Sequence, residues 1–150
     1  MQSKYQNRLD QMKKACNVLD ADAFLVSSLV NVRYLSGFTG SNGFLLISGN
    51  KDFLFTDSRY IEQGREQTCD QITVSLSSGF SALEEVSRLY FITNVAFESD
   101  HLTHSEFIGL EKLLNPRVNL IPSKEVVEKI RAVKDKDEVD LIRKTASLAD

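Results

Sequence analysis

Two histidines three residues apart, His101 and His104, are the first side chains in the sequence that a metal ion could use. Asp100 and Glu106 lie beside them, and imidazole and carboxylate groups are usual zinc ligands. The spacing differs from the HExxH pattern, however, and no further cluster supplies the remaining ligands. Thr103 and Glu106 also have the spacing of a capping box, which explains the same polar residues as a solvated helix start. We favour the helix start over the metal site.

A glycine-rich loop at residues 37–43, with the sequence GFTGSNG, has the composition of a phosphate-binding loop. It lacks the GxGxxG spacing, and it precedes a predicted strand rather than the helix start that would bind a phosphate. We therefore interpret it as a turn whose glycines supply positive φ angles. Phe38 is a large apolar residue in this polar loop. We expect it to be exposed at the rim of a surface that contacts another molecule.

Four carboxylates, Asp22, Asp57, Glu98 and Asp100, lie at the ends of predicted strands, where they could converge on two metal ions. Each also has a local capping or turn role available, and we favour that interpretation. The serines at positions 27, 28 and 41 are not in a GxSxG motif, and neither histidine is placed to suggest a triad. Cys16 lies on an apolar helix stripe, where a thiol is usually inert. The sequence therefore predicts no catalytic constellation.

The elements that would position these residues alternate between helix and strand. Apolar spacing predicts helices at 3–19, 57–67, 81–90 and 103–114, one helical turn at 31–35, and one more helix after Ser123. Strands are predicted at 21–27, 44–48, 53–56, 72–76, 95–98 and 118–121, with 44–56 forming a hairpin. Asp57, Ser81 with Glu84, Thr103 with Glu106, and Ser123 are the expected helix caps. This order predicts an α/β fold with three layers and a mixed, mostly parallel sheet that contains one antiparallel hairpin.

The composition fits one soluble globular domain of 150 residues, 42% hydrophobic and 26% charged. A net charge of -3 with interspersed acids and bases argues against nucleic-acid binding. No apolar signal core or membrane-length run occurs, and two distant cysteines suit a reducing compartment, so we expect a cytoplasmic domain with no membrane partner. The sequence becomes densely charged at Lys134. We expect residues 1–133 to form the domain, and 134–150 to be a linker and the first helix of a further domain.

Three segments of the sequence, residues 31–43, 55–63 and 128–139, carry a pattern that resembles the Xaa-Pro aminopeptidase, prolidase and creatinase family. Residues 31–43, NVRYLSGFTGSNG, resemble the family's NVRYLTGFTGSNG segment. Residues 55–63, FTDSRYIEQ, resemble its TDGRYIEQA segment, with Ser58 where glycine is commoner. Residues 128–139 resemble the junction that leads into the family's catalytic domain. The three segments occur in the family's order and spacing along the whole chain.

This resemblance implies a non-catalytic, ribonuclease-H-like N-terminal domain of the creatinase type. Its own C-terminal "pita-bread" domain would hold two divalent metal ions, manganese, cobalt or zinc, and would release the N-terminal residue that precedes proline in a peptide. No ligand motif of that metal site has a counterpart in this sequence, so the resemblance implies no cofactor here. A relative without peptidase activity, such as a creatinase, stays open. An independent interaction module and a ribonuclease-H-like nuclease are further alternatives.

The family's N-terminal domain is implied to shape substrate access and homodimer contacts, with a loop that approaches the neighbouring subunit's active site. By position that loop is residues 38–42. The candidate cleft or dimer contacts are Phe38, Thr39, Ser41, Asn42, Arg59 and Tyr60. For the last two, a local alternative is open: Arg59 paired with Asp57, and Tyr60 packed under the sheet edge. An arginine in the first turn of a helix opposes the helix dipole, which invites another reason for its presence.

Overall fold

A computed structural model describes residues 2–149. These residues form a six-stranded sheet in the order β4-β3-β2-β1-β5-β6. The strands are β1 (Ala23–Val26), β2 (Phe44–Ser48), β3 (Asp52–Thr56), β4 (Ile72–Leu76), β5 (Asn94–Glu98) and β6 (Asn119–Ser123). The helices are α1 (Gln2–Val18), α2 (Leu29–Ser36), α3 (Ile61–Gln67), α4 (Ala82–Leu89), α5 (His104–Leu114), α6 (Val126–Ala132) and α7 (Lys136–Ala149). The predicted element order is confirmed.

Strand β2 is the one strand of this sheet that runs against the others. It pairs antiparallel with β1 on one side and with β3 on the other. The β3–β4, β1–β5 and β5–β6 pairs are all parallel. The mixed, mostly parallel sheet with one hairpin is therefore confirmed. Because parallel strands end at the same edge, the loops after β1, β3, β4 and β5 gather there.

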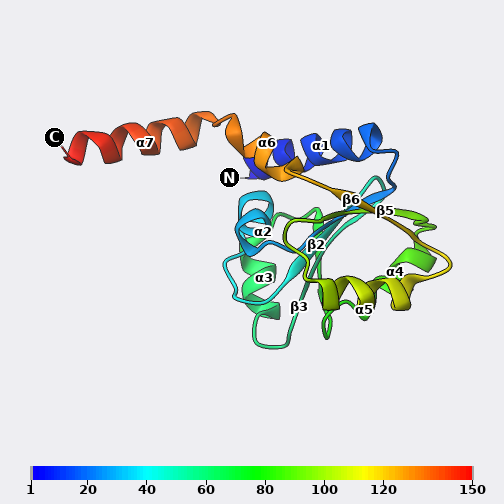
Figure 1. The fold of residues 1–150 in the computed structure, drawn as a ribbon. Helices are drawn as coiled ribbons and strands as arrows, with labels where there is room; N and C mark the ends of the chain where they lie inside the picture. Colours follow the sequence, from blue (N-terminus) through cyan, green and yellow to red (C-terminus); the bar gives the residue numbers. More distant parts are fainter. Residues whose placement is uncertain (1, 150) are drawn as a thin grey trace.

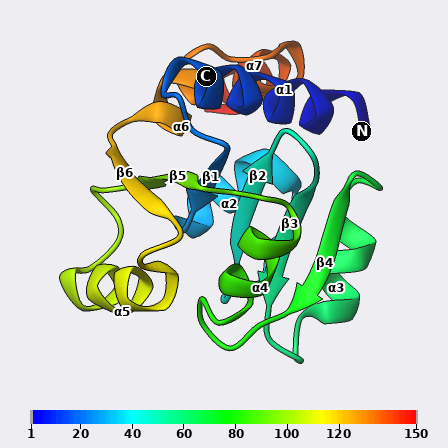
Figure 2. The ribbon, with the colours of Figure 1, turned by 90° about the vertical axis from the view of Figure 1, so that its right-hand side faces the viewer.

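Helices cover both faces of the sheet, which gives the three predicted layers (Figures 1 and 2). Strand β1 shows why: all four of its side chains are buried, and alternate residues feed opposite cores. Phe24 and Val26 join the core under α1, α2 and α6. Ala23 and Leu25 join the core under α4 and α5. A strand buried on both faces explains the continuous apolar run in the sequence.

The helix caps only partly follow the sequence prediction. Thr103 and Glu106 form the predicted capping box at α5. Ser81 makes no capping bond, because its own backbone is already helical (φ −57°, ψ −33°). Ser123 caps no helix either: it ends β6, and its hydroxyl donates to the carbonyl of Ile121. Those two predictions were wrong because a short polar side chain can bond locally in several ways.

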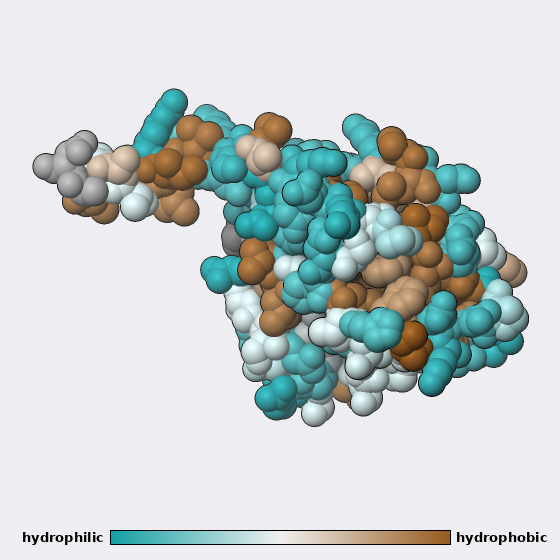
Figure 3. All heavy atoms as spheres, in the orientation of Figure 1, coloured by the Kyte–Doolittle hydropathy of each residue, from teal (hydrophilic) through white to brown (hydrophobic). Residues whose placement is uncertain are grey.

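Helix α7 extends away from the sheet and its covering helices (Figure 1). Its apolar residues Leu141, Ile142 and Leu148 are 66%, 56% and 88% exposed. Figure 3 shows brown, apolar groups on the surface of this projecting helix. The predicted C-terminal helix is confirmed, whereas the boundary at residue 133 stays a prediction. No helix within residues 2–149 combines the length and apolar character needed to cross a membrane.

Replacing either of two helical glycines by alanine should change the free energy of unfolding, with opposite signs at the two positions. A Cβ at Gly109 in α5 meets no atom within 4 Å, so Gly109→Ala should raise the free energy of unfolding by about 0.5–1 kcal/mol through reduced backbone entropy of the unfolded chain. A Cβ at Gly64 in α3 would lie 3.0 Å from Cγ1 of Val74, so Gly64→Ala should lower it. Urea unfolding of both variants measures the two signs. A stabilised Gly64→Ala protein would contradict the packing of α3 on β4.

Candidate functional site

The loop at residues 38–43 leaves α2, crosses the sheet edge and enters β2. Gly37 ends α2 in the left-handed conformation (φ +82°), and its N–H donates to the carbonyl of Arg33. A Cβ at Gly37 would also lie 2.9 Å from the hydroxyl of Tyr5. Both facts favour glycine here. Of the glycines at 37, 40 and 43, only Gly37 has a positive φ, so the expectation of positive φ was wrong for the other two.

Phe38 lies beneath this loop and is 1% exposed, so the expectation that it is exposed was wrong. Its ring meets Tyr60 edge to face, with the ring centroids 6.1 Å apart. The backbone at Gly40 passes directly over the ring: a Cβ there would lie 2.2 Å from Cζ of Phe38. Gly40 is needed for this close approach. The loop therefore folds over its own aromatic residue, and Phe38 anchors the loop from inside.

Polar bonds fasten the rest of the loop to residues 56–67. The N–H of Thr39 donates to Oε1 of Gln67 at 2.8 Å, and Nε2 of Gln63 donates to the Thr39 hydroxyl at 3.0 Å. Ser41 Oγ and the Tyr60 hydroxyl lie 2.6 Å apart. Further along, Nδ2 of Asn42 donates to Oδ2 of Asp57 at 2.6 Å, and the Thr56 hydroxyl donates to the Asn42 carbonyl at 2.5 Å. These contacts join the first two segments of the sequence resemblance, residues 31–43 and 55–63, into one site.

Arg59 and Asp57 form a two-point ion pair at this site. The Nε and NH2 atoms of Arg59 lie 3.0 and 2.8 Å from the two carboxyl oxygens of Asp57. The hydrogen bond from Arg59, followed by the one from Asn42, holds the pKa of Asp57 well below its usual range. Asp57 thus organises a turn instead of capping α3, because the N–H it binds belongs to Arg59. Helix α3 begins at Ile61, so Arg59 precedes it, and the expected dipole conflict does not arise.

All six candidate residues therefore lie in one cluster, although they differ in exposure. Phe38 is buried, and Tyr60 is half-buried against the core beneath α1 and α2. The Arg59 side chain remains 67% exposed while it binds Asp57. Within the chain, Arg59 pairs with Asp57 and Tyr60 packs against the core, as the local alternative predicted. Their role toward a substrate or a second subunit stays a prediction.

A pocket of about 480 Å³ opens beside the loop. Ser41 and Asn42 line this pocket, and Leu29, Phe44 and Phe80 contribute apolar surface. Ser27 and His101 also line it, and Ser27 Oγ lies 3.2 Å from Nδ1 of His101. Sequence analysis did not predict this pair. The signal was nevertheless present: Ser27 follows β1 and His101 lies just beyond β5, and these strands are parallel neighbours.

The four strand-end carboxylates bind different partners. Asp57 binds its near neighbour Arg59, whereas Asp22, Glu98 and Asp100 bind residues far away in the sequence, so the expected local role was wrong for these three. Asp22 accepts from the N–H groups of Thr93 and Asn94, and Asp100 pairs with Lys124 at 3.3 Å. Glu98 accepts bonds from the backbone N–H groups of Ser27 and Ser28, each at 2.7 Å, and from the Asn31 amide at 2.6 Å. Within residues 2–149, no group of three or more His, Cys, Asp or Glu side chains is arranged to hold a metal ion. These residues do not fit a metal pair.

Cys16 and Cys69 are both buried free thiols. Burial, together with the nearby Asp52 carboxylate, raises the pKa of Cys16 to about 11. The reactive thiolate form is therefore scarce at neutral pH, which supports the expected inert role of Cys16.

The order β3-β2-β1-β5-β6 with β2 reversed defines the class of the chain, a three-layer α/β domain of the ribonuclease-H-like type. The family model of the creatinase/prolidase N-terminal domain matches residues 8–133, and the chain belongs to this family. Within residues 2–149, no group of three or more His, Cys, Asp or Glu side chains could hold a metal ion, so the described part of this family domain carries no metal cluster.

Relatives and solved structures agree with this assignment. The chain is 31% identical to "Uncharacterized peptidase YqhT" of Bacillus subtilis over 144 residues, which are 95% of this chain and 40% of that protein. The Xaa-Pro dipeptidase from Bacillus anthracis superposes with a TM-score of 0.84 at 25% identity, covering 91% of this chain and 38% of that one. The N-terminal domain of cytoplasmic peptidase PepQ from Mycobacterium tuberculosis superposes with a TM-score of 0.78 at 32% identity, covering 83% and 98%. The chain thus spans about 40% of the length of the curated relative.

Proposed function

We propose that this chain is the accessory N-terminal domain of a metal-dependent Xaa-Pro peptidase, and that its loop at 38–43 shapes the substrate cleft or the dimer interface. The observation that carries the proposal is the fastened loop beside the pocket, with Arg59 exposed next to it. A loop held by Tyr60, Asp57 and Gln67 keeps one conformation before a partner arrives. Such preorganisation lowers the entropy lost on binding.

The proposed contacts are the polar residues of the loop and Arg59, whereas Phe38 serves as their internal support. Arg59 presents a fixed guanidinium that suits a carboxylate or a carbonyl-rich surface. Leu29 and Val30, 39% and 59% exposed, add apolar area beside the same pocket. We propose that a second copy of the full-length protein covers this surface in a homodimer, and that proline-containing peptides enter beside it.

The catalytic metal pair, with manganese, cobalt or zinc as candidates, would be bound by a following domain. In that domain a metal pair would supply Lewis-acid activation of water for hydrolysis of the peptide bond before proline. We propose that the exposed apolar side of α7 packs against that domain. A cytoplasmic location is supported by the two free cysteines and by the similarity to a peptidase described as cytoplasmic.

The isolated chain should not hydrolyse Xaa-Pro peptides, even with added manganese or cobalt. The reason is the ligand set: the described residues offer no site for a metal pair. The measurement is release of the N-terminal residue from an Xaa-Pro peptide by purified chain, with the same protein plus chelator as control. Chelator-sensitive release would show that the catalytic assignment is wrong.

Arg59→Ala in the full-length enzyme should lower kcat/KM about tenfold or weaken the dimer. A tenfold loss of kcat/KM corresponds to about 1.4 kcal/mol of transition-state binding. Arg59 is mostly exposed, so the thermal stability should change little. Steady-state kinetics and sedimentation velocity on the same sample measure the two effects. Arg65→Ala is the matched control, because Arg65 pairs with Glu62 on the exposed side of α3, with its side chain 60% exposed. If Arg59→Ala had wild-type kinetics and wild-type association, the proposed role of this surface would be contradicted, and the loop would be only a surface turn.

A further inference from the structure

Helix α7 has little packing to hold it in place. Its residues from 140 to 148 are all exposed. The half-buried residues at its base are Asp135, which immediately precedes the helix, and Glu138 and Val139 in its first turn. A helix that projects from a domain without an apolar contact would normally swing about its connection. The direction seen in Figure 1 therefore needs a cause at the base of the helix.

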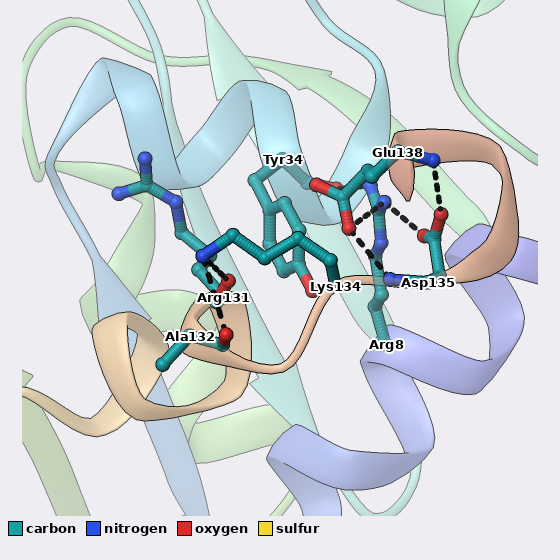
Figure 4. A network of polar contacts seen from close by, with 7 residues as sticks. All are labelled: Arg8, Tyr34, Arg131, Ala132, Lys134, Asp135 and Glu138. Carbon is teal, nitrogen blue, oxygen red and sulfur yellow. Dashed lines mark hydrogen bonds and ion pairs between the residues drawn. The ribbon is translucent and has the colours of Figure 1, made fainter. Parts of the chain in front are cut away.

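The base of α7 is bound by Arg8, a residue of α1 that is only 6% exposed. The NH1 group of Arg8 donates to the carbonyl of Tyr34 at 2.7 Å, and its NH2 group forms a short ion pair with Asp135. The same NH2 atom lies 3.5 Å from Oε2 of Glu138. Figure 4 shows the Arg8 side chain directed at both carboxylates where α7 begins. One buried guanidinium thus connects α1, α2 and α7.

The two carboxylates that Arg8 binds are also those that start the helix. Asp135 Oδ1 accepts from the Glu138 N–H at 2.9 Å, and Glu138 Oε2 accepts from the Asp135 N–H at 3.0 Å. Burial disfavours the charged form of Asp135, but the bonds from Glu138 N–H and Arg8 outweigh it and lower the pKa of this carboxyl. The cap fixes where α7 begins, and the ion pair fixes that cap to the domain.

Tyr34 completes the arrangement as a platform between two arginines (Figure 4). The guanidinium of Arg8 stacks 3.8 Å from the centroid of the Tyr34 ring, and that of Arg131 in α6 lies 5.9 Å from it. Lys134 links the segment before α7 to the end of α6, because its Nζ donates to the carbonyls of Arg131 and Ala132 at 3.1 and 3.2 Å. Stacking and bonding together leave the Arg8 guanidinium one well-defined position.

We propose that Arg8 is a positioning residue that locks α7 in one direction relative to the sheet. Arg8 Nε is buried without a partner, so the guanidinium is retained there at the cost of an unsatisfied donor. Ordinary capping of α7 would require only Asp135 and Glu138, not a buried arginine from the opposite end of the chain. The inference concerns the contacts within this chain and stands apart from the proposed peptidase role.

The test is a distance measurement between nitroxide labels at Lys144→Cys on α7 and Asn50→Cys on the β2–β3 turn. The native cysteines are buried, so the labels attach to the introduced sites. We expect one narrow distance distribution in the otherwise unchanged chain. Arg8→Met keeps much of the buried volume but removes the charge, and we expect it to replace that narrow distribution by a broad one. Arg65→Met, in an exposed ion pair on α3, should leave it unchanged.

Asp135→Asn provides the second variant if Arg8→Met fails to fold. Asparagine retains a capping oxygen but has no charge for Arg8 to bind. Broadening in Asp135→Asn with unchanged helix content, measured by circular dichroism, supports the lock. A broad distance distribution in the labelled chain with Arg8 and Asp135 intact, or a narrow one that persists in Asp135→Asn, would overturn the proposed lock.

Discussion

Phe38→Ala should lower the free energy of unfolding by about 3–5 kcal/mol, a large part of the stability of an ordinary domain. The ring is fully enclosed between Gly40, Gly43 and Tyr60, so its removal leaves a cavity that the loop cannot fill without breaking its bonds to residues 56–67. Urea unfolding of the 150-residue chain gives the value directly. Tm should fall in parallel, by roughly 2–4 °C for each kcal/mol.

Phe91→Ala is the matched control, because Phe91 is 88% exposed and its loss leaves no cavity. Its free energy of unfolding should stay within about 0.5 kcal/mol of the parent chain. If Phe38→Ala proved as mild as Phe91→Ala, the loop would not be folded over its ring, and the preorganised rim that supports the proposed function would be lost with it.

Gly40→Ala should lower the free energy of unfolding by about 1–3 kcal/mol, through overpacking. The added methyl would lie 2.2 Å from Cζ and 2.8 Å from Cε1 of Phe38, and the buried ring has no space to move away. Gly49→Ala is the control: its Cβ would meet nothing within 4 Å. Both are measured by the same unfolding curves.

A double-mutant cycle makes this prediction specific to the one contact. In Phe38→Ala/Gly40→Ala the ring that causes the clash is gone, so the combined loss should be smaller than the sum of the two single losses. Strict additivity would mean that the cost at Gly40 arises from the backbone and not from Phe38.

The element order and the reversed hairpin were predictable because apolar periodicity and turn residues act locally. The burial of Phe38 was not, because it depends on Tyr60, more than twenty residues away, and on the missing Cβ of Gly40. Composition alone marks a phenylalanine among Gly, Thr, Ser and Asn as exposed. Only the three-dimensional path of the loop shows that its polar residues point outward while the ring points in.

The ion pair between Arg8 and Asp135 was equally inaccessible from sequence. Arg8 and Asp135 are separated by 127 positions, and no local pattern relates them. Each residue has an ordinary local explanation, a helix surface arginine and a helix cap. Their meeting depends on α1 and α6 packing on the same face of the sheet, which is a property of the assembled fold.

Glu98 has a consequence for which ligands can approach the pocket beside the loop. Its carboxylate, in a residue that is 7% exposed, sits against the start of α2, where the helix dipole is positive. The Glu98 carboxylate therefore already neutralises the attraction of this helix start for anions. Glu106 adds a second acidic side chain to the lining of the pocket. The pocket should therefore bind phosphate or a free peptide carboxylate weakly. A neutral peptide bond, or the ammonium group at the beginning of a peptide, meets no such repulsion.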